Sequence, residues 1–235
     1  MMCRLAGLTA GVISTAAAAD ATGRGVRVAV IDSGVHAAHP HVGPVEGGVS
    51  FDGQGARGVD AVDRLGHGTA VAAAIHEKAP EATLVPVKVF DRELRATADA
   101  LVAAIDWAIA ARVDLINLSL GTANTAHEAR LTDALRRATD AGVCLVAAAE
   151  QDGIRWLPGS LPQAVGVTLD WGCPRDQAEI EVTEDGRIRR VSMRASGYPR
   201  PIPGVPPERN LKGLSFAVAN ATGLLCRHLS RGLSP

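Results

Sequence analysis

Residues 26–34 read VRVAVIDSG, a Val- and Ile-rich run that ends in a carboxylate, a hydroxyl and a glycine. Gly23 and Gly25 come directly before it. A short apolar run bounded by turn residues is typical of a strand buried on both faces, as strands in a parallel sheet are. Functional groups in an open α/β sheet gather where strands end, so Asp32 is the first candidate functional residue.

The chain on either side of this run alternates between strand and helix patterns. We expect helices over residues 68–77, 96–112, 127–141 and 214–228, and further strands over residues 84–90, 115–120, 143–148 and 164–167. This alternation predicts a doubly wound, mostly parallel sheet with helices on both faces. Residues 180–182 and 188–191 flank the turn Glu184-Asp185-Gly186 and predict a small C-terminal β-hairpin. No interior linker interrupts the pattern, so we expect one domain over residues 1–235.

The charge balance gives little support to several classes of partner. The chain has 24 Lys and Arg against 25 Asp and Glu, and no basic block. A nucleic acid or an anionic membrane surface would call for such a block. No apolar run reaches the length of a transmembrane helix.

The four cysteines are far apart and form no C-x-x-C pair, which argues against a zinc site. Cys144 and Cys226 lie in apolar segments, and we interpret them as small buried hydrophobic residues. A disulfide between two of the cysteines stays open as an alternative.

The first 20 residues, MMCRLAGLTAGVISTAAAAD, have two interpretations. The apolar stretch with an A-x-A-like end resembles a secretory signal peptide. The stretch also carries little positive charge and is interrupted by Gly7, Gly11 and Ser14. We therefore expect an Ala-rich helix that leads into the first strand.

Three reactive side chains lie in short, glycine-containing frames. Asp32 ends the run described above, His67 lies in GHGTAVAAAI (residues 66–75), and Ser215 lies in GLSFAVANATG (residues 213–223). Taken singly, they would be a turn residue, a capping or packing histidine, and a helix N-cap. Taken together, they offer the carboxylate, imidazole and hydroxyl of an acyl-transfer site, in a chain order in which such triads recur.

These three blocks resemble those of the subtilisin-family serine peptidases. INLSLG (residues 116–121) resembles the substrate-binding strand of that family, LVAAAEQDG (residues 145–153) resembles its A-A-G-N segment, and the likeness runs over residues 23–229. The resemblance implies a subtilisin-like α/β fold, with Ser215 as nucleophile, His67 as base and Asp32 orienting the imidazole. It also implies that the backbone of Ser119, Leu120 and Gly121 pairs with an extended substrate. No cofactor is implied.

The segment beside the expected oxyanion hole departs from the family pattern. Gln151 stands where the family has Asn, so it would donate to the oxyanion through a side chain one methylene longer. Alternatively, Gln151 points elsewhere, and backbone N–H groups or a neighbouring side chain form the oxyanion hole. Glu150 and Asp152 fall where the family builds its S1 pocket, and two carboxylates there predict Lys or Arg at P1, the residue on the acyl side of the scissile bond. Alternatively, Glu150 turns outward or blocks the pocket.

His39-Pro40-His41 resembles a family segment in which an Asp at the second His position binds calcium. Histidine nitrogen is a poor calcium ligand, so we expect no calcium site. A transition-metal cluster that includes His36 is a weaker alternative. We therefore expect neither a metal nor a cofactor.

The sequence thus predicts a serine endopeptidase that cleaves a specific peptide or protein, in a task such as peptide maturation. Asp32 lies too near the N-terminus for a folding propeptide before it, which favours a cytoplasmic enzyme over a secreted one. The alternative function is a non-catalytic, subtilisin-like peptide-binding protein. Hydrolysis of a small ester or lipid is weaker, since that class has a G-x-S-x-G elbow and another residue order. The sequence does not determine the oligomeric state.

Overall fold

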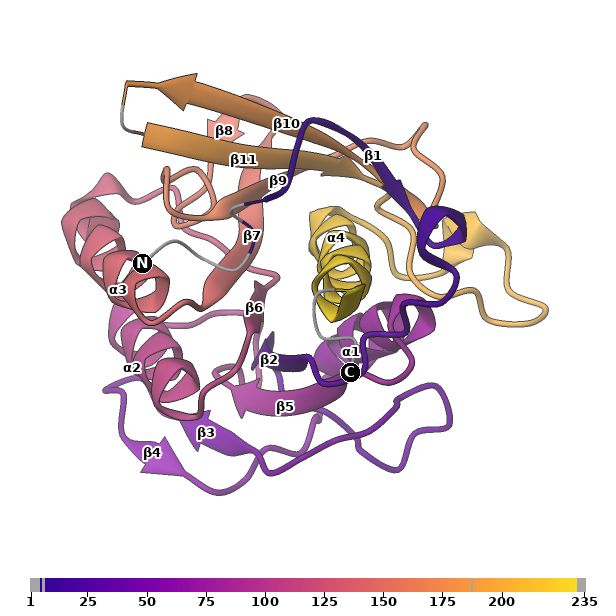
Figure 1. The fold of residues 1–235 in the computed structure, drawn as a ribbon. Helices are drawn as coiled ribbons and strands as arrows, with labels where there is room; N and C mark the ends of the chain where they lie inside the picture. The colour runs from indigo at the N-terminus through magenta and orange to yellow at the C-terminus, as the bar shows by residue number, and fades with distance from the viewer. Residues whose placement is uncertain (1–4, 6, 187, 232–235) are drawn as a thin grey trace.

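The computed structural model describes Leu5, residues 7–186 and residues 188–231. Its centre is a sheet with five neighbouring parallel strands (Figure 1). In spatial order they are β9 (Val165–Leu169), β7 (Cys144–Gln151), β6 (Leu115–Leu118), β2 (Arg27–Asp32) and β5 (Thr83–Lys88). The expected mostly parallel α/β architecture is therefore confirmed.

Shorter or later strands extend the sheet at both edges. One edge carries β11 (Ile188–Ala195), β10 (Gln177–Asp185) and β1 (Gly11–Ser14), and the other carries β3 (Val49–Phe51) and β4 (Arg57–Gly58). In addition, β8 (Ile154–Arg155) pairs only with the end of β7. The outer pairs β1–β10, β10–β11, β3–β4 and β7–β8 are antiparallel.

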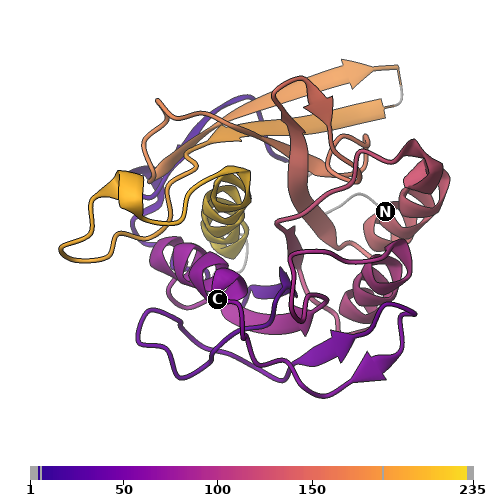
Figure 2. The ribbon, with the colours of Figure 1, turned by 180° about the vertical axis from the view of Figure 1, so that it is seen from behind.

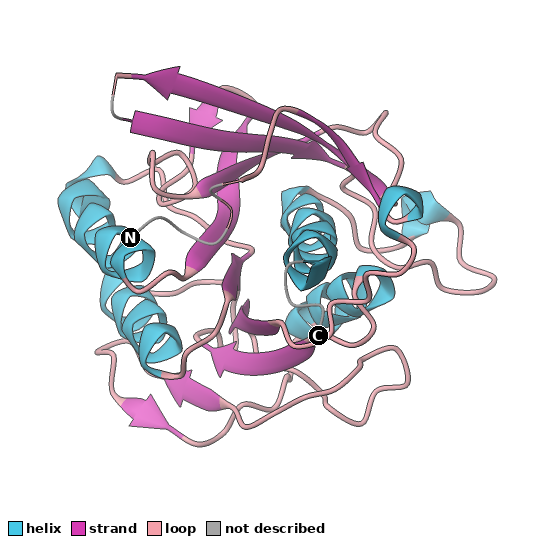
Figure 3. Ribbon diagram, in the orientation of Figure 1, coloured by secondary structure: helices cyan, strands magenta, loops and turns pink. Residues whose placement is uncertain are grey.

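Helices cover both faces of the sheet (Figure 3). They are α1 (His67–Lys78), α2 (Ala98–Ala110), α3 (Glu128–Asp140) and α4 (Leu214–Ser230), with single turns of 3₁₀-helix at Ala16–Ala18, Thr125–His127 and Pro207–Arg209. Successive residues of β2 point to opposite faces of the sheet. Val28 and Val30 pack with α1 and α4, whereas Ala29 and Ile31 pack with α2 and α3. This explains why the strand is apolar throughout.

Helices α1 and α4 lie against each other, and both views show them side by side (Figure 2). A β-carbon on Gly223 of α4 would lie 2.8 Å from Lys78 Cβ and 3.0 Å from the Ile75 carbonyl oxygen of α1. Only glycine therefore permits this close approach. Because His67 and Ser215 stand at the starts of these two helices, their packing helps to set the distance between the two side chains.

One expectation about local structure is wrong and another is confirmed. The expected N-terminal helix is instead strand β1, which pairs with β10, followed by one 3₁₀ turn at Ala16–Ala18. Residues 1–4 and 6 lie outside the described residues. The expected C-terminal hairpin is confirmed as β10 and β11, and β11 also joins the main sheet beside β9.

The cysteines divide into two groups. Cys144 is disulfide-bonded, so the interpretation of this residue as a simple buried hydrophobe is wrong. Cys226 is buried and free, and its burial raises the pKa of its thiol. Cys173 is half-buried and free.

Within the described part of the chain, no helix combines the length and apolar character that crossing a membrane requires.

Candidate active site

The carboxyl end of β2 and the start of α1 meet at one hydrogen bond. Asp32 is fully buried, and its Oδ1 lies 2.7 Å from Nδ1 of His67, the first residue of α1. The next residue of the helix must be small, since a β-carbon on Gly68 would lie 2.1 Å from the Gly34 carbonyl oxygen. The glycine after His67 thus lets the helix begin in contact with the turn after β2.

A second carboxylate, Asp63, holds this turn in place. Its Oδ1 accepts the Ser33 hydroxyl at 2.8 Å, and its Oδ2 accepts the Thr69 backbone N–H at 2.8 Å. The Ser33 hydroxyl in turn accepts the Gly68 N–H at 2.9 Å. Burial opposes ionisation of Asp63, but the hydrogen bonds from Thr69 and Ser33 outweigh it and lower its pKa. Asp63 is not among the site residues predicted from the sequence, although an Asp shortly before a helix is a common capping signal.

The same environment raises the pKa of the His67 imidazole. Burial is the largest influence and would lower the pKa of the ring. The hydrogen bond and charge of Asp32, together with the charge of Asp63, oppose burial and prevail. The net effect favours an imidazolium paired with a buried carboxylate.

Ser215 lies in the first turn of α4, and its hydroxyl donates to the carbonyl oxygen of Ser119 at 3.0 Å. The Ser119 hydroxyl donates back to the Ser215 carbonyl oxygen at 3.2 Å. Asn117 donates to the Ser119 hydroxyl at 2.8 Å and accepts the Thr222 hydroxyl of α4 at 3.0 Å. These buried and partly buried hydrogen bonds hold the start of α4 against the end of β6.

His67 and Ser215 face a common cleft of about 350 Å³. The other residues that line it are Phe90, Leu94, Ser119, Leu120, Gly121, Ala148, Gln151, Trp156 and Leu214. The structure therefore brings Asp32, His67, Ser215 and the segment Ser119–Gly121 to one place. It hydrogen-bonds His67 to Asp32, while the Ser215 hydroxyl rests on Ser119.

The residues after β7 form a hairpin with β8. Gln151 pairs with Ile154, and Asp152 and Gly153 adopt positive φ angles of 54° and 74° at the turn. Gln151 lines the cleft, but its side-chain amide donates to the Asp152 carboxylate at 3.1 Å. The side-chain amide of Gln151, the predicted oxyanion donor, therefore lies at the cleft but is hydrogen-bonded to Asp152.

Glu150 and Asp152 are exposed and are not among the residues that line the cleft. Glu150 pairs across the hairpin with Arg155, which is also exposed. The structure thus does not bring the two carboxylates into the cleft, and the exposure of Glu150 agrees with the alternative in which it turns outward. Trp156 directly follows this hairpin and lines the cleft, and it is not among the site residues predicted from the sequence.

The histidine-rich segment does not form a metal cluster with its neighbours. The rings of His39 and His41 stand edge to face with centroids 5.2 Å apart. Among the residues that the structure describes, no three His, Cys, Asp or Glu side chains come together as metal ligands. The imidazole of His41 does not suit calcium, which prefers oxygen ligands.

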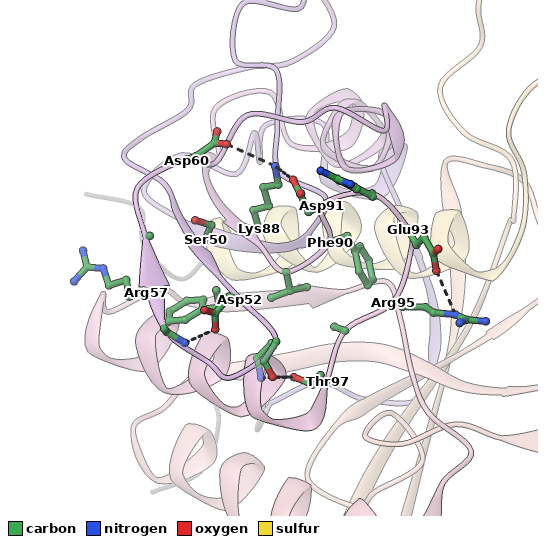
Figure 4. Close-up of a pocket in the computed structure, with 18 residues that line it drawn as sticks. Ser50, Asp52, Arg57, Asp60, Lys88, Phe90, Asp91, Glu93, Arg95 and Thr97 are labelled. Atoms are coloured by element: carbon green, nitrogen blue, oxygen red, sulfur yellow. Dashed lines mark hydrogen bonds and ion pairs between the residues drawn. The ribbon is translucent and has the colours of Figure 1, made fainter.

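A larger cavity of about 790 Å³ lies elsewhere, beside β3 and the segment 90–97 (Figure 4). It contains none of Asp32, His67 and Ser215. Charges of both signs line it, and buried Lys88 lies 3.1 Å from Asp91 and 3.8 Å from Asp60. Lys88 is thus paired within the protein. The smaller cleft, which contains His67 and Ser215, is the candidate active site.

Comparison with known proteins agrees with this choice. The sequence profile of the subtilase family matches residues 23–165. The chain is 31% identical to a subtilisin of Bacillus pumilus over 224 residues, which cover 89% of this chain and 75% of that protein. It is 31% identical to subtilisin E of Bacillus subtilis over 220 residues, 89% of this chain and 54% of that protein. It is also 39% identical to the minor extracellular protease Epr of Bacillus subtilis over 142 residues, 56% of this chain and 21% of that protein.

Solved structures give the same result. Sphericase matches with a TM-score of 0.66 and 26% identity, covering 91% of this chain and 80% of that one. A cold-adapted subtilisin-like serine proteinase, at 23% identity and a TM-score of 0.63, shares the fold. The chain spans about half the length of subtilisin E and about a fifth of Epr. From the match over residues 23–165 and the shared fold, the chain belongs to the subtilase family.

Proposed function

We propose that this protein is a serine endopeptidase in which Ser215, His67 and Asp32 act as nucleophile, base and orienting carboxylate. The observation that carries the proposal is the 2.7 Å bond between buried Asp32 and His67, in a cleft that Ser215 also lines. A serine hydroxyl is a weak nucleophile until an adjacent base removes its proton. Family membership supports the same activity.

The geometry suggests the order of events. Asp32 holds the Nδ1–H of His67, which leaves Nε2 to accept a proton. The Ser215 hydroxyl leaves the Ser119 carbonyl, gives its proton to Nε2 and attacks the substrate carbonyl carbon. The imidazolium, stabilised by Asp32, then protonates the leaving amine, and water repeats the sequence to release the acyl group. The first N–H groups of α4 lack intrahelical partners and can stabilise the oxyanion.

A fluorophosphonate probe tests this proposal directly, because it reacts covalently with an activated serine. The wild-type protein should be labelled, and Ser215→Ala should not. Ser50→Ala is a matched control, since Ser50 lines the other cavity and should not affect labelling. Labelling of Ser215→Ala at the wild-type rate would show that another residue reacts.

Two observations favour the alternative, a non-catalytic peptide-binding protein. The Gln151 amide donates to Asp152, and the Ser215 hydroxyl donates to Ser119 rather than to His67. Such a protein would retain the Ser119–Gly121 backbone for peptide binding but would not turn over. Peptide binding without any fluorophosphonate labelling of the wild type would favour this alternative.

The substrate and its setting are finer proposals. A specific peptide or protein substrate, cleaved in a maturation step, remains our prediction. So does a cytoplasmic location, but the disulfide-bonded state of Cys144 weighs against it, because disulfides persist mainly in oxidising compartments. One relative is named an extracellular protease, which also favours the secreted alternative. Fractionation of the native host would decide between the two compartments.

A further inference from the structure

Trp156 lines the candidate cleft and lies outside the three motifs that carry Asp32, His67 and Ser215. The segment Ser119–Gly121 after β6 and the end of β7 form the two walls of the cleft beside Ser215. Trp156 donates its backbone N–H to the Ala149 carbonyl oxygen at 2.8 Å. The next residue, Leu157, exchanges two backbone hydrogen bonds of 2.9 Å with Thr122. Residues 156–157 therefore connect the two walls.

The side chain of Trp156 lies directly against the wall that would hold the substrate. A β-carbon on Gly121 would lie 3.0 Å from Trp156 Cβ and 3.6 Å from Cε3 of the indole. The ring is half-buried and packs against the core cluster that includes Ala148. Its Nε1 is buried and has no hydrogen-bond partner within the described structure. The indole thus occupies space beside the Gly121 backbone as a packed part of the fold.

We propose that Trp156 fills the S1 pocket and restricts P1 to Gly, Ala or Ser. This inference rests on the proposed peptidase function. A substrate strand paired with Ser119–Gly121, with its carbonyl at Ser215, directs the P1 side chain between the two walls. The indole already takes up the space at the Gly121 end of that gap. Only a short P1 side chain fits in the space that the indole leaves.

The chemistry of the walls agrees with a small, uncharged P1 residue. Leu120, Ala148 and the indole are apolar, and Gln151 is a neutral polar group at the edge. Glu150 and Asp152 are exposed and do not line the cleft. Among the described residues that line the pocket, no anionic group is available to pair with Lys or Arg. This inference therefore replaces the expectation of a basic P1 residue.

A peptide library randomised at every position, with cleavage sites read by mass spectrometry, tests the inference on the full chain. The wild type should cleave after Gly, Ala or Ser at least about tenfold more often than after Leu, Phe or Arg, because steric differences in a closed pocket are worth about this much. Trp156→Ala should raise cleavage after Leu and Phe by about tenfold or more. Trp156→Phe is the matched control, since it retains an aromatic ring and should retain the preference for small residues.

Fluorophosphonate labelling of the same samples distinguishes a failure of the pocket inference from a failure of the peptidase function. A labelled wild type that prefers Leu, Phe or Arg at P1 overturns the role of Trp156 alone. Trp156→Ala that is labelled but keeps the wild-type profile overturns it as well. An unlabelled wild type refutes the peptidase function and this inference with it. If Trp156→Ala fails to fold and is not labelled, the P1 preferences of the wild type and Trp156→Phe test the inference instead. A preference for Gly, Ala or Ser in both supports it, and a preference for Leu, Phe or Arg in the wild type refutes it.

Discussion

The carboxylates around His67 have two opposing effects on the proposed catalysis. They stabilise the imidazolium that forms during the reaction, but they also favour protonation of the ring beforehand, and His67 can act as a base only while its imidazole is neutral. Burial lowers the pKa of the ring, but the hydrogen bond and charge of Asp32 and the charge of Asp63 raise it further. The carboxylate that orients the ring also stabilises the protonated form. In the proposed mechanism the cleft stabilises the imidazolium that forms during acyl transfer. The proposed activity therefore requires a pH above the pKa of His67 in the protein without substrate.

This environment predicts the pH dependence of activity. Because the pKa of His67 is raised, kcat/KM should fall as the pH drops through a value above 6.5, the ordinary histidine pKa. Asp32→Asn removes a charge that raises the pKa of His67. The acid limb of the residual activity should therefore shift to a lower pH. Its kcat should also fall by a factor on the order of 10⁴, as in other triads. A wild-type acid limb at or below pH 6.5 would contradict this account.

The ability of Gln151 to donate to an oxyanion depends on its contact with Asp152. Its amide donates to Asp152 at 3.1 Å and so is not free for an oxyanion. Gln151→Asn shortens the side chain, removes it from that contact and should raise kcat by about tenfold, since one well-placed oxyanion donor is worth about 10² to 10³.

The matched control is Gln151→Ala, measured by the same steady-state assay. It should leave kcat within about twofold of wild type, because the backbone of α4 remains as donor. A hundredfold loss in Gln151→Ala would show that the native amide already serves the reaction.

The start of helix α1 illustrates how an element, rather than a side chain, sets the site. Gly68 lies against the Gly34 carbonyl oxygen and near the Asp32 carboxylate, which a β-carbon would approach to 3.2 Å. Any side chain here must move the helix away from the turn after β2. The bond between Asp32 and His67 would lengthen with it, although both residues would still be present.

Gly68→Ala should therefore reduce activity and stability together. Overpacking of this kind costs about 1–3 kcal/mol, and a displacement of about 1 Å at a catalytic group can cost about a hundredfold in rate. Thermal unfolding and the rate of fluorophosphonate labelling measure the two effects. Gly7→Ala is the control, because a β-carbon at Gly7 would meet nothing within 4 Å in the described part of the chain and should change neither quantity. Normal labelling of a well-folded Gly68→Ala protein would contradict the proposed contact.

The helices and central strands follow from the sequence, but the short elements do not. Strand β2 and helices α1 to α4 were predicted with small differences at their ends, because their apolar patterns are long and have clear boundaries. Strands β3, β4 and β8 have only two or three residues and no periodicity to detect. Strand β1 lies in an Ala-rich context that favours a helix, and pairing with β10 overrides this local preference.

For the molecule as a whole, the disulfide at Cys144 is the feature with the widest consequence. Cys144 begins β7, in the centre of the sheet and beside the strand that leads to the cleft. A native disulfide contributes about 2–4 kcal/mol. A reductant should thus lower the Tm of the wild-type protein by about 5–15 °C, given the usual shift of 2–4 °C per kcal/mol at this size.

Two variants serve as controls in the same unfolding measurement. The Tm of Cys144→Ala should not respond to the reductant, because no disulfide remains at this position. Cys226→Ala should respond as the wild type does, because Cys226 is a free thiol. A wild-type Tm that is unchanged by reductant would show that the disulfide does not stabilise the fold.

The sequence by itself determined the fold class and the three residues of the candidate triad. Each of these depends on local patterns: an apolar strand that ends in Asp32, and helices that begin at His67 and near Ser215. The tertiary structure decided the shape and charge of the pocket. The side chain of Trp156 lies against Gly121, and Glu150 faces solvent, because a hairpin turns at Asp152 and strand pairing sends neighbouring residues to opposite sides. The contact between Trp156 and Gly121 joins segments that are distant in sequence, so no local pattern encodes it.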